Sequence, residues 1–162
     1  MEKEIFEAVI GFSRMEEGYV LEYSAAPSSV GKENPIGLSE IKFQRLSEKK
    51  DSIVGSYELT EDVYTDWINK NTERSILSVL ADHPEIHLMP EDGFNSLQTE
   101  YRHSWSMFFT LTRPGVSKDG NTAIVQITGF CPGGIPNYGS ILYMENSGGK
   151  WNVLSSFGLY NQ

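Results

Sequence analysis

Two histidines have a spacing that metal sites use. His83 and His87 are four positions apart, as two ligands on one face of a helix would be, and Asp82 and Glu85 lie beside them. Pro84 lies inside the pair, however, and the segment is predicted to be extended. The two imidazoles would then lie on one strand face about 13 Å apart, too far for a shared zinc ion. We therefore expect solvated loop histidines, no metal site and no cofactor.

Cys131 is the only cysteine of the chain, which excludes an internal disulfide. Together with His103 it would supply a nucleophile and a general base. No helix N-terminus is predicted after Cys131 to activate its thiol, and spacing assigns no Asn or Asp to orient the histidine. A lone cysteine is typically a small buried side chain. We expect no catalytic residue and favour a protein that is not an enzyme.

Paired glycines at 133–134 and 148–149 are a third candidate for a functional site, because glycine-rich loops can bind phosphate groups. Neither pair opens a helix after a strand, and neither is followed by Lys and then Ser or Thr, as a P-loop requires. Both pairs are typical of turns, where glycine supplies positive φ angles.

The chain is acidic, with 22 Asp and Glu against 13 Lys and Arg and a net charge of −9. The negative electrostatic field of such a chain repels DNA and RNA, so nucleic acid is disfavoured as a partner. A basic protein suits the net charge better. The residues expected to form an acidic patch are Glu16, Glu17, Glu22, Glu61, Asp62 and Asp66. The alternative is that these charges cap a helix and keep the protein soluble.

Apolar residues make up 39% of the sequence, which is enough for a packed core in a single domain over residues 1–162. No apolar run is long enough to span a membrane, and the first residues form an amphipathic segment rather than a signal sequence. The sequence predicts a cytoplasmic protein if it is complete. If a signal segment was trimmed, a periplasmic or envelope-associated protein is expected.

The last third of the chain predicts an antiparallel meander. Its four runs of strand-forming residues lie at 107–113, 122–130, 138–145 and 150–157. Short turn signals at 117–121 and 146–149 separate two pairs of these runs. Val125 and Ile127 alternate with polar neighbours, which is typical of a sheet with two different faces.

Two helices are predicted from the apolar spacing of the first 70 residues. The first spans 2–14, and its buried face is expected to comprise Ile5, Phe6, Val9, Ile10 and Phe12. The second follows Thr60, a good N-cap, and its apolar face is built by Val63, Tyr64, Trp67 and Ile68.

Shorter elements connect these helices to the meander. Strands or extended pieces are predicted at 19–23, 41–45, 54–59, 77–80 and 86–89. The second and third of these are expected to pair, a long loop is expected at 24–38, and a third helix at 93–103. All three tryptophans, Trp67, Trp105 and Trp151, are expected to be buried on the apolar sides of their elements.

Together these elements predict an α+β fold. A curved antiparallel sheet, containing the C-terminal four-strand meander, would be packed on one face by about three helices. A cone-shaped arrangement, like that of nuclear-transport-factor-2 or cystatin, suits an opening helix followed by a long meander. Such a fold would leave a pocket between helix and sheet, where His103, Trp105 or Tyr143 would line the cavity.

A series of motifs runs through residues 109–151. They are Thr112-Arg113, Lys118-Asp119, Ala123-Ile124-Val125, Cys131-Pro132-Gly133-Gly134, Leu142-Tyr143-Met144-Glu145 and Gly149-Lys150-Trp151. This block resembles the C-terminal part of a family of uncharacterised bacterial proteins, many of which are exported or lipid-anchored. Residues 65–71 and 5–9 are similar to two helix segments of the same family. The resemblance implies a fold and brings no activity with it.

Many members of that family have a second cysteine after the paired glycines, where this chain has Ile135-Pro136. Two polar residues belong to the shared motifs and are expected to act structurally. Asn71 would cap the end of the second helix in a left-handed conformation, and Arg113 would pair with an acidic neighbour at a strand end.

Two classes of function stay open. The first is a non-enzymatic binding or interaction module, either an envelope-associated domain or an acidic, immunity-type protein that neutralises a basic partner. The second is a small-molecule-binding or hydrolytic enzyme that uses the pocket between helix and sheet.

Overall fold

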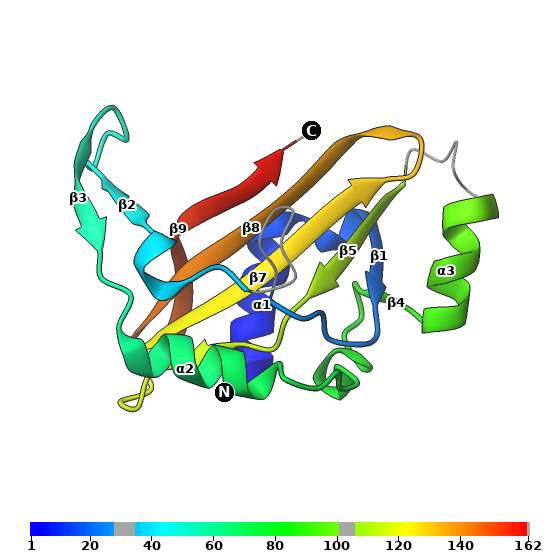
Figure 1. Ribbon diagram of the computed structural model, residues 1–162, viewed down its shortest axis with the longest axis horizontal. Helices are drawn as coiled ribbons and strands as arrows, with labels where there is room; N and C mark the ends of the chain where they lie inside the picture. The colour runs from blue at the N-terminus through cyan, green and yellow to red at the C-terminus, as the bar shows by residue number, and fades with distance from the viewer. Residues whose placement is uncertain (28–34, 101–105, 162) are drawn as a thin grey trace.

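The computed structural model describes residues 1–27, 35–100 and 106–161 (Figure 1). The helices are α1 (Glu2–Ser13), α2 (Glu61–Lys70) and α3 (Glu91–Glu100), with 3-10 turns η1 (Met15–Glu17), η2 (Leu38–Glu40) and η3 (Ser78–Leu80). The strands are β1 (Gly18–Leu21), β2 (Phe43–Leu46), β3 (Ile53–Tyr57), β4 (His87–Met89), β5 (Met107–Leu111), β6 (Gly115–Val116), β7 (Thr122–Cys131), β8 (Gly134–Ser147) and β9 (Lys150–Asn161). This is the predicted α+β class with three helices.

The C-terminal strands form the predicted meander. The main sheet has the order β4-β1-β5-β7-β8-β9, and β6 pairs with the start of β7. Antiparallel pairing joins β5 to β7, β7 to β8 and β8 to β9, with Ile124 opposite Tyr143. The sheet as a whole is mixed rather than purely antiparallel, because β1 runs parallel to both β4 and β5. The expected pairing of β2 with β3 is also present, as a separate two-stranded sheet.

Helices cover both faces of the sheet, which corrects the expectation that they would pack on one face. Successive residues of β7 point to opposite sides. Val125 belongs to the core under α1, where Ile5 and Phe6 are buried. Ile124 belongs to the core under α2, together with Trp67. Figure 1 shows α1 passing behind β7, while α2 lies in front.

The buried face of α1 differs from the predicted one at a single position. Ile5, Phe6, Val9 and Ile10 are buried, but the Phe12 side chain is 55% exposed. Its helical angle places Phe12 beside Ile5. However, Phe12 lies in the last turn of the helix and lines a pocket with Val153 and Leu154 of β9, beyond which the main sheet has no further strand among the described residues.

Two segments that were predicted to be extended are turns. Residues 78–80 form η3, in which the Leu80 N–H donates to the Leu77 carbonyl at 3.0 Å, so both leucines can be buried at i, i+3 spacing. His83 also lies in a turn, and its carbonyl accepts from the Ile86 N–H. The predicted strand begins only at His87, in β4.

The third helix begins two residues earlier than predicted, because the Phe94 N–H already donates to the Pro90 carbonyl at 2.9 Å. Its predicted end at residue 103 lies outside the described residues. Phe94 packs against Phe108 and Phe130 in a small aromatic cluster at this end of the sheet. Among the described helices, none has the length and hydrophobicity needed to cross a membrane.

Candidate functional site

Helix α2 presents a polar face to solvent because its apolar residues are all used on the other side. Val63 and Trp67 are fully buried against the sheet. Thr60 is the N-cap, in an extended conformation, and the Tyr64 N–H donates to its carbonyl. The Thr60 hydroxyl donates to the Asp62 carboxylate rather than capping the backbone.

Two contacts fix α2 against the chain between β5 and β7. The Trp67 Nε1–H donates to Thr112 Oγ1 at 3.0 Å inside the core. Gly115 approaches the helix so closely that a Cβ atom there would lie 2.3 Å from the Trp67 Cβ and 2.6 Å from the Val63 carbonyl oxygen. Only glycine permits this approach, so β6 lies directly against the helix.

Asn71 completes the attachment at the end of α2. Its buried side chain donates to the Trp67 carbonyl at 2.8 Å and to the Arg113 carbonyl at 3.0 Å. The Asn71 Oδ1 accepts from the Arg113 N–H at 2.8 Å. Asn71 has φ −108° and not the expected left-handed conformation, because its amide bridges two segments instead of closing a turn. As predicted, Arg113 pairs with an acidic residue, Glu2, through two hydrogen bonds of 3.2 Å.

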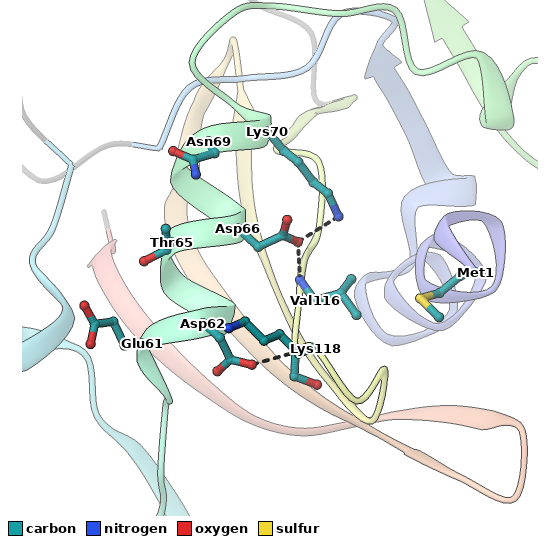
Figure 2. Close-up of a pocket in the computed structure, with 10 residues that line it drawn as sticks. Met1, Glu61, Asp62, Thr65, Asp66, Asn69, Lys70, Val116 and Lys118 are labelled. Atoms are coloured by element: carbon teal, nitrogen blue, oxygen red, sulfur yellow. Dashed lines mark hydrogen bonds and ion pairs between the residues drawn. The ribbon is translucent and has the colours of Figure 1, made fainter.

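An open groove of about 810 Å³ lies between α2 and the segment that follows β6 (Figure 2). We call it the acidic groove. Its lining residues are Met1, Glu61, Asp62, Thr65, Asp66, Asn69, Lys70, Val116, Ser117 and Lys118. Figure 2 shows Asp62 and Asp66 projecting from the helix toward Lys118 and Val116. One wall is therefore helical and the other is the edge of a turn.

Backbone donors hold two of the carboxylates in place. Asp66 accepts from the Val116 N–H at 2.8 Å and pairs with Lys70 at 2.7 Å. Asp62 accepts from the Lys118 N–H at 2.9 Å. The two carboxylates thus have defined orientations, although both groups are at least partly exposed.

The groove lining carries three carboxylates, Glu61, Asp62 and Asp66, against two lysines, Lys70 and Lys118. Hydrogen bonds from the Thr60 hydroxyl and then from the Lys118 N–H lower the pKa of Asp62. Both donors are neutral, so Asp62 keeps its full negative charge at neutral pH. In the adjoining turn, the Ser117 hydroxyl and the Asn121 N–H lower the pKa of Asp119 in the same way. In contrast, the negative charge of Asp66 is offset by its ion pair with Lys70.

The expected acidic patch is thus assembled in part. Glu61, Asp62 and Asp66 line one groove. Glu17 and Glu22 belong to η1 and to the chain after β1, and neither lines it. The Glu16 side chain lies outside the described part of the structure. Sequence reasoning missed the second wall of the groove. Its signal was the predicted turn at 117–121, in which the Lys118 N–H donates to Asp62 of the helix.

Of the three residues expected to line a pocket between helix and sheet, Tyr143 alone lies in the described part of the structure. Tyr143 is 5% exposed and packs against Phe43 and Tyr57, with ring centroids 5.1 and 4.9 Å away. Burial, and then the charge of Glu145, raise the pKa of the Tyr143 phenol. His103 and Trp105 lie outside the described residues. Of the other tryptophans, Trp67 and Trp151 are buried, as predicted.

The remaining chemical candidates are placed as follows. Cys131 is 4% exposed at the end of β7, and His103, its candidate base, is not described. His83 accepts a hydrogen bond at Nδ1 from the Glu85 N–H, at 3.2 Å. Over residues 1–27, 35–100 and 106–161, no three His, Cys, Asp or Glu side chains are grouped so that they could hold a metal ion.

No protein-family model matches the chain, and comparisons with curated proteins and with solved structures give no significant match. Function is therefore inferred from the chemistry of the groove itself. Its carboxylates, amide and hydroxyl suit charge pairing and hydrogen bonding with ammonium or guanidinium groups.

Proposed function

We propose that the protein is a non-enzymatic binding module and that the acidic groove receives basic side chains of a protein partner. The observation that carries this proposal is the pair of neighbouring carboxylates Glu61 and Asp62, with Asp119 in the adjoining turn. Asp62 and Asp119 accept hydrogen bonds from neutral donors and so keep their charge. A lysine or arginine would find preoriented acceptors there.

The net charge of −9 supports the same partner class over longer distances. Electrostatic attraction would speed the encounter with a basic protein and weaken as salt screens it, over a Debye length of about 8 Å at physiological ionic strength. Lys70 and Lys118 lie within the groove and limit its negative potential. Their positions favour a partner that brings a few basic side chains over one with a continuous basic stripe.

The experiment is an affinity capture with matched variants. The double variant Glu61→Gln with Asp62→Asn removes two charges while retaining an oxygen acceptor for the Lys118 N–H. Its control, Asp82→Asn with Glu85→Gln, removes two exposed charges outside the groove. We expect the wild type and the control to retain the same basic partner, and the groove variant to lose it.

Purified complexes then give the affinity at low and high salt. Loss of the two groove charges should weaken binding about three- to thirtyfold, since exposed charge pairs contribute roughly 0.2–1 kcal/mol each and interfacial pairs more. A captured partner that is acidic, or one that binds the groove variant as tightly as the wild type, would refute the proposal.

A further inference from the structure

No strand among the described residues pairs with β9 on its outer edge, although β2 packs against β9. β9 is the last strand of the main sheet and pairs with β8. The β2–β3 hairpin belongs to another sheet, and it meets β9 where the Ser155 hydroxyl donates to the Gln44 carbonyl at 2.8 Å. Backbone N–H and C=O groups along this edge are therefore open to pairing with another extended chain.

The sequence of β9 lacks the protection that edge strands usually carry. Charged residues and prolines prevent further pairing at most exposed edges. From Trp151 to Asn161, β9 has neither. Register shifts opposite β8 interrupt it near Leu154 and Leu159, but Ser155–Gly158 between them is in continuous register with β8. A regular stretch of unprotected edge thus remains.

This edge forms the floor of a second groove, of about 580 Å³, which we call the edge groove. Phe12 of α1 and Val153 line one side of it, and Leu46 and Tyr57 of the hairpin line the other. The side chains of Phe12, Leu46 and Leu154 are 55%, 47% and 41% exposed. Figure 1 shows the hairpin projecting beyond β9 at one end of the molecule. Because side chains of an added strand alternate between two faces, each face would meet some of these apolar side chains. The other lining residues are polar or charged: Gln44, Ser47, Glu48, Lys50, Ser155 and Ser156.

The hairpin has a charge opposite to that of the chain as a whole. Residues 42–51 carry Lys42, Arg45, Lys49 and Lys50 against Glu48 and Asp51, a net charge of +2 within a chain of net charge −9. Lys50 and Glu48 both line the edge groove. The Arg45 guanidinium lies 5.9 Å from the ring centroid of Tyr57, another lining residue. An acidic group next to the bound strand would be attracted to the net positive charge of the hairpin.

We propose that the edge groove binds an extended peptide segment of a partner protein, apolar on both faces and flanked by Asp or Glu, by adding it as a strand beside β9. Main-chain hydrogen bonds to Ser155–Gly158 supply affinity that does not depend on sequence. The apolar side chains of the groove and the net positive charge of the hairpin supply selectivity. This site is separate from the acidic groove and takes the opposite charge.

The test begins with a displayed library of random linear peptides selected on the intact protein. Enriched peptides should contain a run of four or more β-branched or aromatic residues without proline, followed or preceded by Asp or Glu. Amide hydrogen exchange with such a peptide bound should slow at Ser155–Gly158. Failure to enrich this pattern, or an unchanged exchange rate along β9, would overturn the proposal.

Two hairpin variants locate the peptide. Leu46→Asp places a carboxylate inside the edge groove and should weaken peptide binding at least about fivefold, as loss of an interface anchor does. Val54→Asp makes the same change at a site that is 59% exposed on the same hairpin and outside the groove, and should leave affinity unchanged. Equal effects of the two variants would contradict the proposed location.

Charge reversal and association state complete the test. Lys49→Glu with Lys50→Glu should weaken binding of the acid-flanked peptide about threefold or more at low salt, with a smaller effect at high salt. Sedimentation of the protein alone should show a monomer. A dimer that Leu46→Asp dissociates would assign the edge to a second copy of the chain and overturn the peptide proposal.

Discussion

Replacing Asn71 with alanine should destabilise the fold, although Asn71 lies at the end of a helix. The substitution removes three hydrogen bonds, to the Trp67 carbonyl and to the N–H and carbonyl of Arg113. At about 0.5–1.5 kcal/mol of net stabilisation for each bond, the expected loss is about 2–4 kcal/mol. That is a large fraction of the roughly 5–15 kcal/mol that holds a domain folded.

The assay is urea unfolding followed by tryptophan fluorescence, with circular dichroism as a second probe. For an m-value of about 2 kcal/mol/M, the midpoint of Asn71→Ala should fall by about 1–2 M. Asn69→Ala is the matched control, because Asn69 is exposed on the same helix. A cost for Asn71→Ala below about 0.5 kcal/mol, close to that of Asn69→Ala, would refute this reasoning.

Asn71→Asp separates the loss of donors from the loss of volume. The introduced carboxylate would still accept from the Arg113 N–H but would face two carbonyl oxygens. Its pKa should therefore be raised in the folded state, so the variant gains stability relative to the wild type as pH falls from 7 toward 4. A difference between variant and wild type that is constant over this range would contradict the geometry described.

Three further predictions concern the core and the acid limit of stability. Trp67→Ala should cost about 3–5 kcal/mol in urea unfolding, as large-to-small core changes do, and a cost below about 1 kcal/mol would contradict its full burial. Gly115→Ala should cost about 1–3 kcal/mol by forcing β6 away from Val63, and a wild-type midpoint would show that the contact is not tight. Hydrogen bonds lower the pKa values of Asp62 and Asp119 below the ordinary 3.8, so the stability that they contribute is present above that value and lost as pH falls below it. Thermal unfolding between pH 6 and 2 measures this, and a melting temperature that does not fall below pH 4 would contradict it.

The sequence predicted the meander well because its information is local. Each signal involves only a few neighbouring residues: the period-two alternation around Val125 and the short turns at 117–121 and 146–149. The structure has the corresponding strands. The placement of helices on two faces depends on contacts between distant segments. Trp67 finds its partner Thr112 far along the chain, and nothing in the pattern of α2 says which face of the sheet it will cover.

The candidate site was predicted only where it lies on one element. Glu61, Asp62 and Asp66 are close in sequence, so their proximity followed from the helix. The contribution of Val116 and Lys118 depends on the close approach that Gly115 permits, which spacing cannot reveal. Exposed apolar residues such as Phe12 were assigned to the core because a periodic pattern does not show where a sheet ends.

The central claim is that a basic partner binds the acidic groove, and the most direct measurement is an NMR titration of the labelled protein with the captured partner. We predict shifts concentrated at Glu61–Lys70 and at residues 115–119, with an affinity that falls as salt is raised from about 50 to 500 mM. The Glu61→Gln, Asp62→Asn variant should lose these shifts. Shifts confined to other surfaces, or an affinity that does not depend on salt, would contradict the claim.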